Sequence, residues 1–376
     1  MLVAQSLSAN LVFATFIAIG IGSRCAAVVP ERIAALIEEL RSDEFDRREA
    51  AAQELEKVGE SVLPQLRTAA LESKDFEVRF HAEQLIFEVL RAAGVSTSTD
   101  MTFAVIERGE FSMGTPEDQY PRQNNQTPHP VRITRSFLLG THEVTQKQYE
   151  HVMKVNPSGF AEARSGNKQS PDPVADKVEG METTAFPVEQ ISWYDAIAFC
   201  NQLSNDEGLV PSYTMESITR EGHSITNAAV TSLETNGYRL PTEAEWEFAC
   251  RAGTVTPLNY GEPTNGSMAN LKGDNSYAST QEGFYVGHTV KVGSYKPNAR
   301  GLWDMHGNVS EWCWDWYGPY DDGPLDDPRG PAEGRQRVQR GGAWLVTEQN
   351  CCSSSRLGVA PGERKNHAGF RVARSP

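Results

Sequence analysis

NARGLWDMHGNVSEW, at residues 298–312, places two carboxylates, Asp304 and Glu311, seven residues apart around a Gly-Asn turn. Calcium binds several oxygen atoms at once, drawn from carboxylates and from turn carbonyls. A stretch of this kind supplies both types of oxygen. Taken alone, the pattern indicates either a calcium site or two acidic side chains that cap turns.

This stretch is the fifth of six motifs that follow one another between residues 101 and 374. The others read FSMG at 111–114, EVTQKQY at 143–149, PV at 187–188 with SWYDA at 192–196, YRLPTEAEWE at 238–247, and RGGAW at 340–344 with GFR at 369–371. In this order and spacing, the motifs resemble those of the sulfatase-modifying factor family, the family of formylglycine-generating enzymes. The resemblance implies an α+β fold, a variant of the C-type-lectin-like fold that is low in regular secondary structure.

The resemblance also implies two calcium sites. The first would use Asp304, Gly307, Val309 and Glu311, with Gly307 and Val309 contributing backbone oxygens. The second would use Asn270, Leu271, Glu282 and Phe284, with Glu282 where the family usually has Asp. The loop between its two halves is shorter than in the family, and the alternative is an ordinary solvated loop.

The family's oxidation chemistry depends on two cysteines that follow the RGGAW-type motif and together hold copper(I), which activates oxygen to oxidise a substrate cysteine. Cu(I) prefers soft thiolate ligands. In this chain the first of the two positions is Val346 and the second is Cys351. The adjacent Cys352 is a poor substitute, because neighbouring side chains diverge in an extended backbone. Cys351 is therefore a candidate catalytic residue without its partner, and Cys351 and Cys352 are expected to form a buried pair or a disulfide.

Three helices are expected to begin with a capping box, at Thr145, Ser192 and Thr242, each followed three residues later by Gln, Asp or Glu. The second helix carries an apolar stripe at the helical spacing of i, i+3, i+4 and i+7. Its members are Ala196, Phe199, Cys200 and Leu203. The third helix presents Trp246, Ala249 and Cys250 and is expected to end at Gly253. His129 and His142 are interpreted as surface or packing residues.

Residues 1–27 have the pattern of a signal peptide, with an apolar run from Leu11 to Gly22 and small residues up to Ala27. The run is short for a membrane span, which needs about 20 residues. No Lys or Arg precedes it, so an uncleaved N-terminal anchor is the alternative. The expected location is exported, periplasmic or extracellular.

Residues 28–93 are expected to be helical and repetitive. A shift of 31 residues superposes Leu40 on Leu71, Arg48 on Arg79, and Phe45 on Phe76. Such a period is similar to HEAT-type repeats, with a plain helical spacer as the alternative. Two repeats rarely stand alone, so the unit should pack on the following domain or on a partner. A linker at 94–100 then leads into the sulfatase-modifying factor domain, residues 101–376.

The formal net charge of −15 disfavours nucleic acid as a partner. Two functions remain. One is an exported, calcium-stabilised domain that recognises peptide or carbohydrate and has lost the copper-dependent activity. The alternative is an active formylglycine-generating oxidoreductase that oxidises a cysteine in sulfatases. Val346 favours the first, because valine offers copper no ligand.

Overall fold

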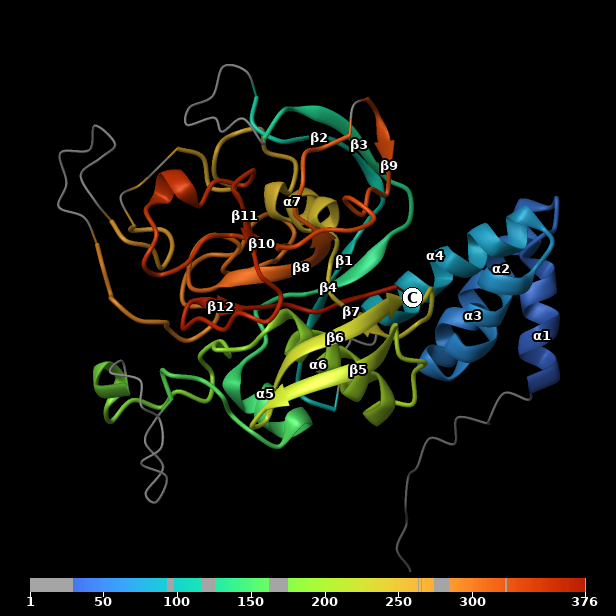
Figure 1. The fold of residues 1–376 in the computed structure, drawn as a ribbon. Helices are drawn as coiled ribbons and strands as arrows, with labels where there is room; N and C mark the ends of the chain where they lie inside the picture. The colour runs from blue at the N-terminus through green and yellow to red at the C-terminus, as the bar shows by residue number, and fades with distance from the viewer. Residues whose placement is uncertain are drawn as a thin grey trace, which may run out of the picture.

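The computed structural model describes residues 30–92, 98–116, 126–161, 175–262, 264, 266–273, 284–321 and 323–375 (Figure 1). The predicted signal peptide and residues 93–97 of the linker region lie outside this set. No helix in the described part of the chain is both long enough and apolar enough to cross a membrane.

The N-terminal helices form two hairpins that reproduce the 31-residue period in their contacts. The helices are α1 (Pro30–Glu39), α2 (Phe45–Val58), α3 (Leu63–Glu72) and α4 (Phe76–Ala92), with a short 3₁₀ turn, η1 (Gly59–Val62), between the hairpins. Arg48 donates to the carbonyl of Ser42 at 2.6 Å, and Arg79 donates to the carbonyl of Ser73 at 2.8 Å. Both arginines also lie over the phenylalanine that opens their helix. The sequence repeat is therefore a structural repeat as well.

The helical unit packs on the following domain. Packing on this domain or on a partner was expected, because two repeats rarely stand alone. The apolar core of the unit extends to Leu138, which is fully buried, and to Phe103 and Val105. These three side chains belong to strands β1 (Phe103–Ile106) and β4 (Phe137–Gly140). Figure 1 shows α4 on the side of the unit that faces these strands, with α1 farthest away.

The described residues of the C-terminal domain form four small sheets. Their strand orders are β1-β4-β13-β7, β11-β10-β8-β12, β2-β3-β9 and β5-β6. The further strands are β2 (Gly109–Met113), β3 (His129–Ile133), β5 (Tyr213–Glu221), β6 (Ser224–Ser232), β7 (Tyr238–Arg239), β8 (Ser310–Trp316), β9 (Leu325–Asp326), β10 (Arg337–Arg340), β11 (Arg356–Val359), β12 (Ala368–Gly369) and β13 (Ala373–Arg374). Several strands have only two residues, and long irregular segments connect them. This is the predicted α+β fold with little regular secondary structure.

Three helices lie among the sheets, and each begins as predicted. They are α5 (Gln146–Met153), α6 (Trp193–Asp206) and α7 (Glu243–Arg251), with short 3₁₀ turns η2 (Ala175–Val178) and η3 (Glu348–Asn350) elsewhere. All three predicted capping boxes are present, at Thr145, Ser192 and Thr242. The apolar stripes predicted for α6 and α7 are fully buried. Helix α7 ends at Arg251 with Ala252 as its C-cap, and Gly253 follows as the predicted C′ residue with a φ of 90°.

Buried arginines hold the irregular segments in place. Arg340 in β10 pairs with Glu247 of α7 and donates to the carbonyls of Ser353 and Ser355 at 2.9 and 2.6 Å. Arg251 reaches from the same helix to the carbonyl of Gly114 at 2.7 Å. A domain with so much irregular backbone needs contacts beyond regular secondary structure to hold it together. Charge-assisted hydrogen bonds to backbone carbonyls fulfil part of that need.

Candidate functional site

The segment after β10 brings the predicted thiol position into the protein interior. Gly342, with a φ of +71°, passes so close to Cys351 that a Cβ at this position would lie 2.1 Å from the Cys351 Sγ. Cys351 is completely buried and lies in an apolar cluster with Ala269 and Leu271, against which Val346 packs. The valine therefore occupies space beside the thiol.

The other cysteines do not approach Cys351 as a partner. The Cys352 Sγ lies 3.4 Å from the carbonyl oxygen of Gln349, and the Cys250 Sγ lies 3.6 Å from His306 Nε2. All five cysteines in the described residues are free and buried. Of the two expectations for Cys351 and Cys352, a buried pair is therefore what the structure contains.

Burial also keeps these thiols protonated. It raises the pKa of the Cys351 thiol far above its usual range and that of Cys352 to about 11. His306 offers no free base, because its Nε2 accepts from the Asn259 N–H at 3.0 Å. Its Nδ1 donates to the Cys351 carbonyl at 2.7 Å. Burial lowers the pKa of His306 to about 4, so the ring is neutral.

The loop at 304–311 follows the predicted turn closely. Asp304 has a φ of 56° and accepts the Gly293 N–H at 2.7 Å. Gly307 is required, because a Cβ there would lie 2.3 Å from the carbonyl oxygen of Asn270. Asn308 fixes the approach by donating its backbone N–H to the same carbonyl at 2.9 Å. The two predicted calcium loops therefore touch each other.

Glu311 forms a buried ion pair with Arg371. Its two carboxylate oxygens accept from Arg371 Nε and Nη2, both at 2.6 Å, and Trp246 Nε1 adds a bond of 2.7 Å. Glu311 and Arg371 are both fully buried. A buried guanidinium group thus balances the charge of Glu311, and its role as a calcium ligand stays a prediction.

A third carboxylate, Glu143, joins this cluster and was given no role from the sequence. It accepts from the Asn308 side chain at 2.8 Å and from the Val309 N–H at 3.1 Å. Burial, with Asp304 and Glu311 nearby, raises the pKa of Glu143 well above its usual value. Burial and the nearby Glu311 raise the pKa of Asp304 to about 6. For Arg371 the sequence did contain a signal, a charged residue among the apolar residues of GFRVA at 369–373.

At the second predicted calcium site, Asn270 is 2% exposed. Its amide nitrogen donates to the His288 carbonyl at 3.0 Å, while its Oδ1 is buried with no hydrogen-bond partner. Leu271 is buried beside it, and the carbonyl of Phe284 accepts from the Gly273 N–H at 2.9 Å. Glu282 lies outside the described residues.

An aromatic surface adjoins the thiol segment. It consists of the exposed rings of Phe284 and Tyr285, with the buried Trp344 packed against Tyr285 and Lys177 over the Trp344 ring. Phe284 is 62% exposed and Tyr285 is 47% exposed, and Tyr285 stacks on Trp344 at 6.2 Å. The Lys177 Nζ lies 5.1 Å from the centre of the Trp344 ring.

Comparison with known proteins agrees with the motifs. The sulfatase-modifying factor enzyme 1-like domain matches residues 88–376. The chain is 37% identical over 281 residues to the formylglycine-generating enzyme of Streptomyces coelicolor, covering 70% of this chain and 86% of that enzyme. The chain belongs to the sulfatase-modifying factor family.

Other relatives in the family have different names. The chaperone protein LppX of Paenibacillus barcinonensis is 33% identical over 283 residues, covering 69% of this chain and 86% of LppX. Treponema denticola variable protein 1 superposes with a TM-score of 0.58 at 32% identity, covering 73% of this chain and 95% of that one. PvdO from Pseudomonas aeruginosa gives a TM-score of 0.56 at 25% identity, covering 75% and 98%. The family fold thus occurs in proteins with several functions.

The metals implied by family membership can be compared with these side chains. Copper(I) does not fit, because the position that should carry the partner thiol of Cys351 is occupied by the apolar Val346. Among the described residues, no three His, Cys, Asp or Glu side chains are grouped to hold a metal by themselves. Calcium also uses amide and backbone oxygens, and the unpartnered Asn270 Oδ1 fits that role.

Proposed function

We propose that this chain is an exported, calcium-stabilised member of the family that recognises a protein or peptide without copper-dependent oxidation. The observation that carries the proposal is the packing of Val346 against the apolar cluster around Cys351. A thiol pair is the minimum ligand set for the copper chemistry, and here one of the two positions is hydrocarbon.

The aromatic surface supports a recognition role. Phe284 and Tyr285 expose large rings beside Trp344, and aromatic side chains are enriched where proteins bind partners. Aromatic rings also bind sugars, so carbohydrate is the alternative ligand. The names of two relatives, a formylglycine-generating enzyme and a chaperone, favour a protein or peptide.

Calcium would act as a structural ion between the two loops. Asn270 would contribute its Oδ1, and Asp304 with the carbonyls of Gly307 and Val309 would supply the neighbouring oxygens. A cation there would relieve the excess negative charge of Glu143 and Asp304, which share one arginine with Glu311. Calcium at 100 times its dissociation constant should stabilise the fold by about 2.7 kcal/mol. Thermal unfolding with calcium or with EGTA tests this, and Asn270→Ala should remove most of the difference.

A titration with copper(I) tests the loss of oxidase chemistry. The reduced native protein should bind no copper stoichiometrically, whereas Val346→Cys, which restores the second thiol, should bind one equivalent. Cys351→Ala in the Val346→Cys background is the matched control and should abolish that binding. Tight binding by the native chain that disappears in Cys351→Ala would overturn the proposal and restore the oxidase function.

Recognition is tested separately by screening the purified protein against peptide and glycan arrays. Phe284→Ala and Tyr285→Ala should each weaken a binding signal at least tenfold. Val210→Ala is the control, because Val210 is 59% exposed and lies outside the aromatic surface. A signal that survives both aromatic substitutions would place the ligand elsewhere, and glycan binding alone would replace peptide by carbohydrate.

A further inference from the structure

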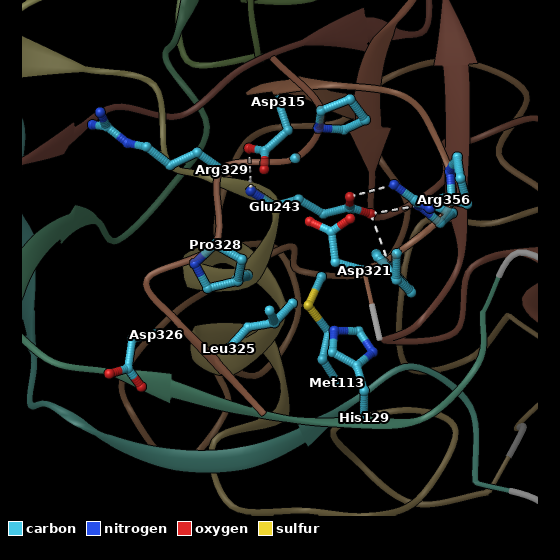
Figure 2. Close-up of a pocket in the computed structure, with 15 residues that line it drawn as sticks. Met113, His129, Glu243, Asp315, Asp321, Leu325, Asp326, Pro328, Arg329 and Arg356 are labelled. Carbon is cyan, nitrogen blue, oxygen red and sulfur yellow. Dashed lines mark hydrogen bonds and ion pairs between the residues drawn. The ribbon is translucent and has the colours of Figure 1, made fainter. Parts of the chain in front are cut away.

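A cavity of about 110 Å³ lies away from the thiol segment and from both predicted calcium loops (Figure 2). Its walls come from β2 and β3, from the start of α7, from the end of β8, and from the segment 319–331. A cavity of about 150 Å³ holds a benzene molecule, so this one suits a slightly smaller group.

One wall is an ion pair that is already complete. Glu243 accepts from Arg356 Nε at 2.7 Å and Nη2 at 2.5 Å, and Tyr320 donates to it at 3.2 Å. Arg356 also donates to the Gly318 carbonyl at 2.7 Å. Arg340 Nη1 also lies 3.7 Å from Glu243 Oε1, so two arginines surround this carboxylate, and it offers a ligand little free hydrogen-bonding capacity.

Another part of the wall has a buried acceptor without a donor. His129 is 7% exposed, and its Nδ1 lies 3.0 Å from the carbonyl oxygen of Thr127. A carbonyl accepts only, so Nδ1 carries the proton and Nε2 is an acceptor. The Nε2 is buried and has no hydrogen-bond partner. A buried polar atom in this state is unfavourable unless a ligand or water satisfies it.

Two further carboxyl groups line the same cavity. Asp315 is 2% exposed and accepts the Glu243 N–H at 2.7 Å, and burial, with Glu243 nearby, raises its pKa to about 7. Asp321 lies on the wall as well, and in Figure 2 it is drawn between Glu243 and Met113. The guanidinium of Arg329 is directed away from Asp321 in the same view. The remaining wall is largely apolar, with Met113, Leu325, Pro319, Pro328 and Pro331.

We propose that this cavity binds a primary ammonium group on a short apolar stem. An ammonium carries three N–H donors and no acceptor, which matches an imidazole nitrogen and two carboxylates. Its positive charge would offset Asp315 and Asp321. The apolar wall would enclose the stem. A carboxylate ligand would be repelled by the same two residues, and an alcohol brings one donor and no charge.

Two sources share this chemistry, a free alkylamine and the side chain of a lysine on a partner. A second hollow of about 490 Å³ adjoins the cavity and shares His129, Pro319, Tyr320 and Asp321 with it. That hollow gives room for the chain that would carry a lysine. The proposal is independent of the recognition role assigned to the aromatic surface.

Calorimetric titration of the full chain with n-butylamine tests the proposal, with n-butanol and butyrate as matched controls. A ligand of this size should bind with a dissociation constant on the order of 1–10 mM. N-acetyl-lysine N-methylamide, compared with the norleucine analogue, distinguishes the sources. Binding of both amines supports a lysine, and binding of butylamine alone supports a free amine.

Two substitutions should weaken binding of the amine at least fivefold. Asp321→Asn removes a charge at an exposed position, and His129→Phe removes the acceptor while keeping a ring against Tyr320, whose centre is 4.6 Å away. Glu234→Gln, whose parent side chain is 80% exposed outside the cavity, is the control and should bind as the native chain does. Absence of saturable amine binding, equal binding of n-butanol, or no effect of Asp321→Asn would each overturn the proposal.

Discussion

Replacing Arg371 by methionine should destabilise the C-terminal domain more than replacing its partner Glu311 by glutamine. Arg371 is the cation nearest to three buried carboxylates, Glu143, Asp304 and Glu311, and all three raise its pKa. Without the guanidinium, Glu311 loses its bidentate bond. The backbone carbonyls of Gly140, Thr141 and Trp303 lose a donor at 3.0, 3.4 and 2.9 Å. Stranding a buried carboxylate in this way costs about 3–5 kcal/mol.

Glu311→Gln is the matched comparison and should cost about 1–2 kcal/mol, in the range of one hydrogen bond to a charged group. The glutamine keeps an acceptor for Trp246, and Arg371 still faces Glu143 and Asp304. The two losses of stability should differ because the remaining charges differ. Arg371→Met leaves three buried carboxylates without their cation, whereas Glu311→Gln leaves the cation with two carboxylates.

Chemical denaturation followed by tryptophan fluorescence measures both variants. All seven tryptophans lie between residues 193 and 344, so the signal reports the C-terminal domain and not the helical unit. Equal losses of unfolding free energy in the two variants, or a loss below about 1 kcal/mol for Arg371→Met, would refute the assignment of Arg371 as the main counter-charge.

Three further outcomes are expected. Burial raises the pKa of Asp315 to about 7, so the folded state binds the carboxyl proton more tightly than the unfolded state does. The resulting contribution to stability is full below about pH 4 and is lost as the pH rises through 7. Asp315→Asn should therefore flatten the pH dependence of the unfolding free energy in denaturation curves measured from pH 5 to 8. Gly342→Ala should lower the unfolding free energy by about 2–4 kcal/mol, because Gly342 has a positive φ and a Cβ there would collide with Cys351 Sγ. A smaller loss in a Cys351→Ala background would show that this collision contributes to the loss. Leu40→Ala should cost about 2–5 kcal/mol and its repeat equivalent Leu71→Ala less than about 0.5, since they are 0% and 72% exposed; equal melting temperatures by circular dichroism would contradict this.

Local features were predictable from the sequence because their partners lie within a few residues. A capping box joins side chain and backbone three residues apart, so Thr145, Ser192 and Thr242 were assigned correctly. The 31-residue period was also readable, since Arg48 and Arg79 bond to carbonyls six residues away.

Long-range partners were not predictable. Glu311 was predicted as a calcium ligand from its loop and from the family's motif, but its ion pair with Arg371, 60 residues further along the chain, was not predicted. His129 was interpreted as a surface or packing residue, and nothing near it in the sequence indicated the cavity that it shares with Asp315. One sequence, without the fold, does not indicate which side chains come into contact when they lie far apart along the chain.

The contact of the helical unit with β1 and β4 determines how this architecture can grow. The sheet closes the array at α4, through Leu138, Phe103 and Val105, and takes the place that a next repeat would occupy. Duplication of a repeat could therefore lengthen the array only before α1, at the polar outer face of that helix. Relatives with longer arrays would extend away from the sheet, while the surface next to it stays the same.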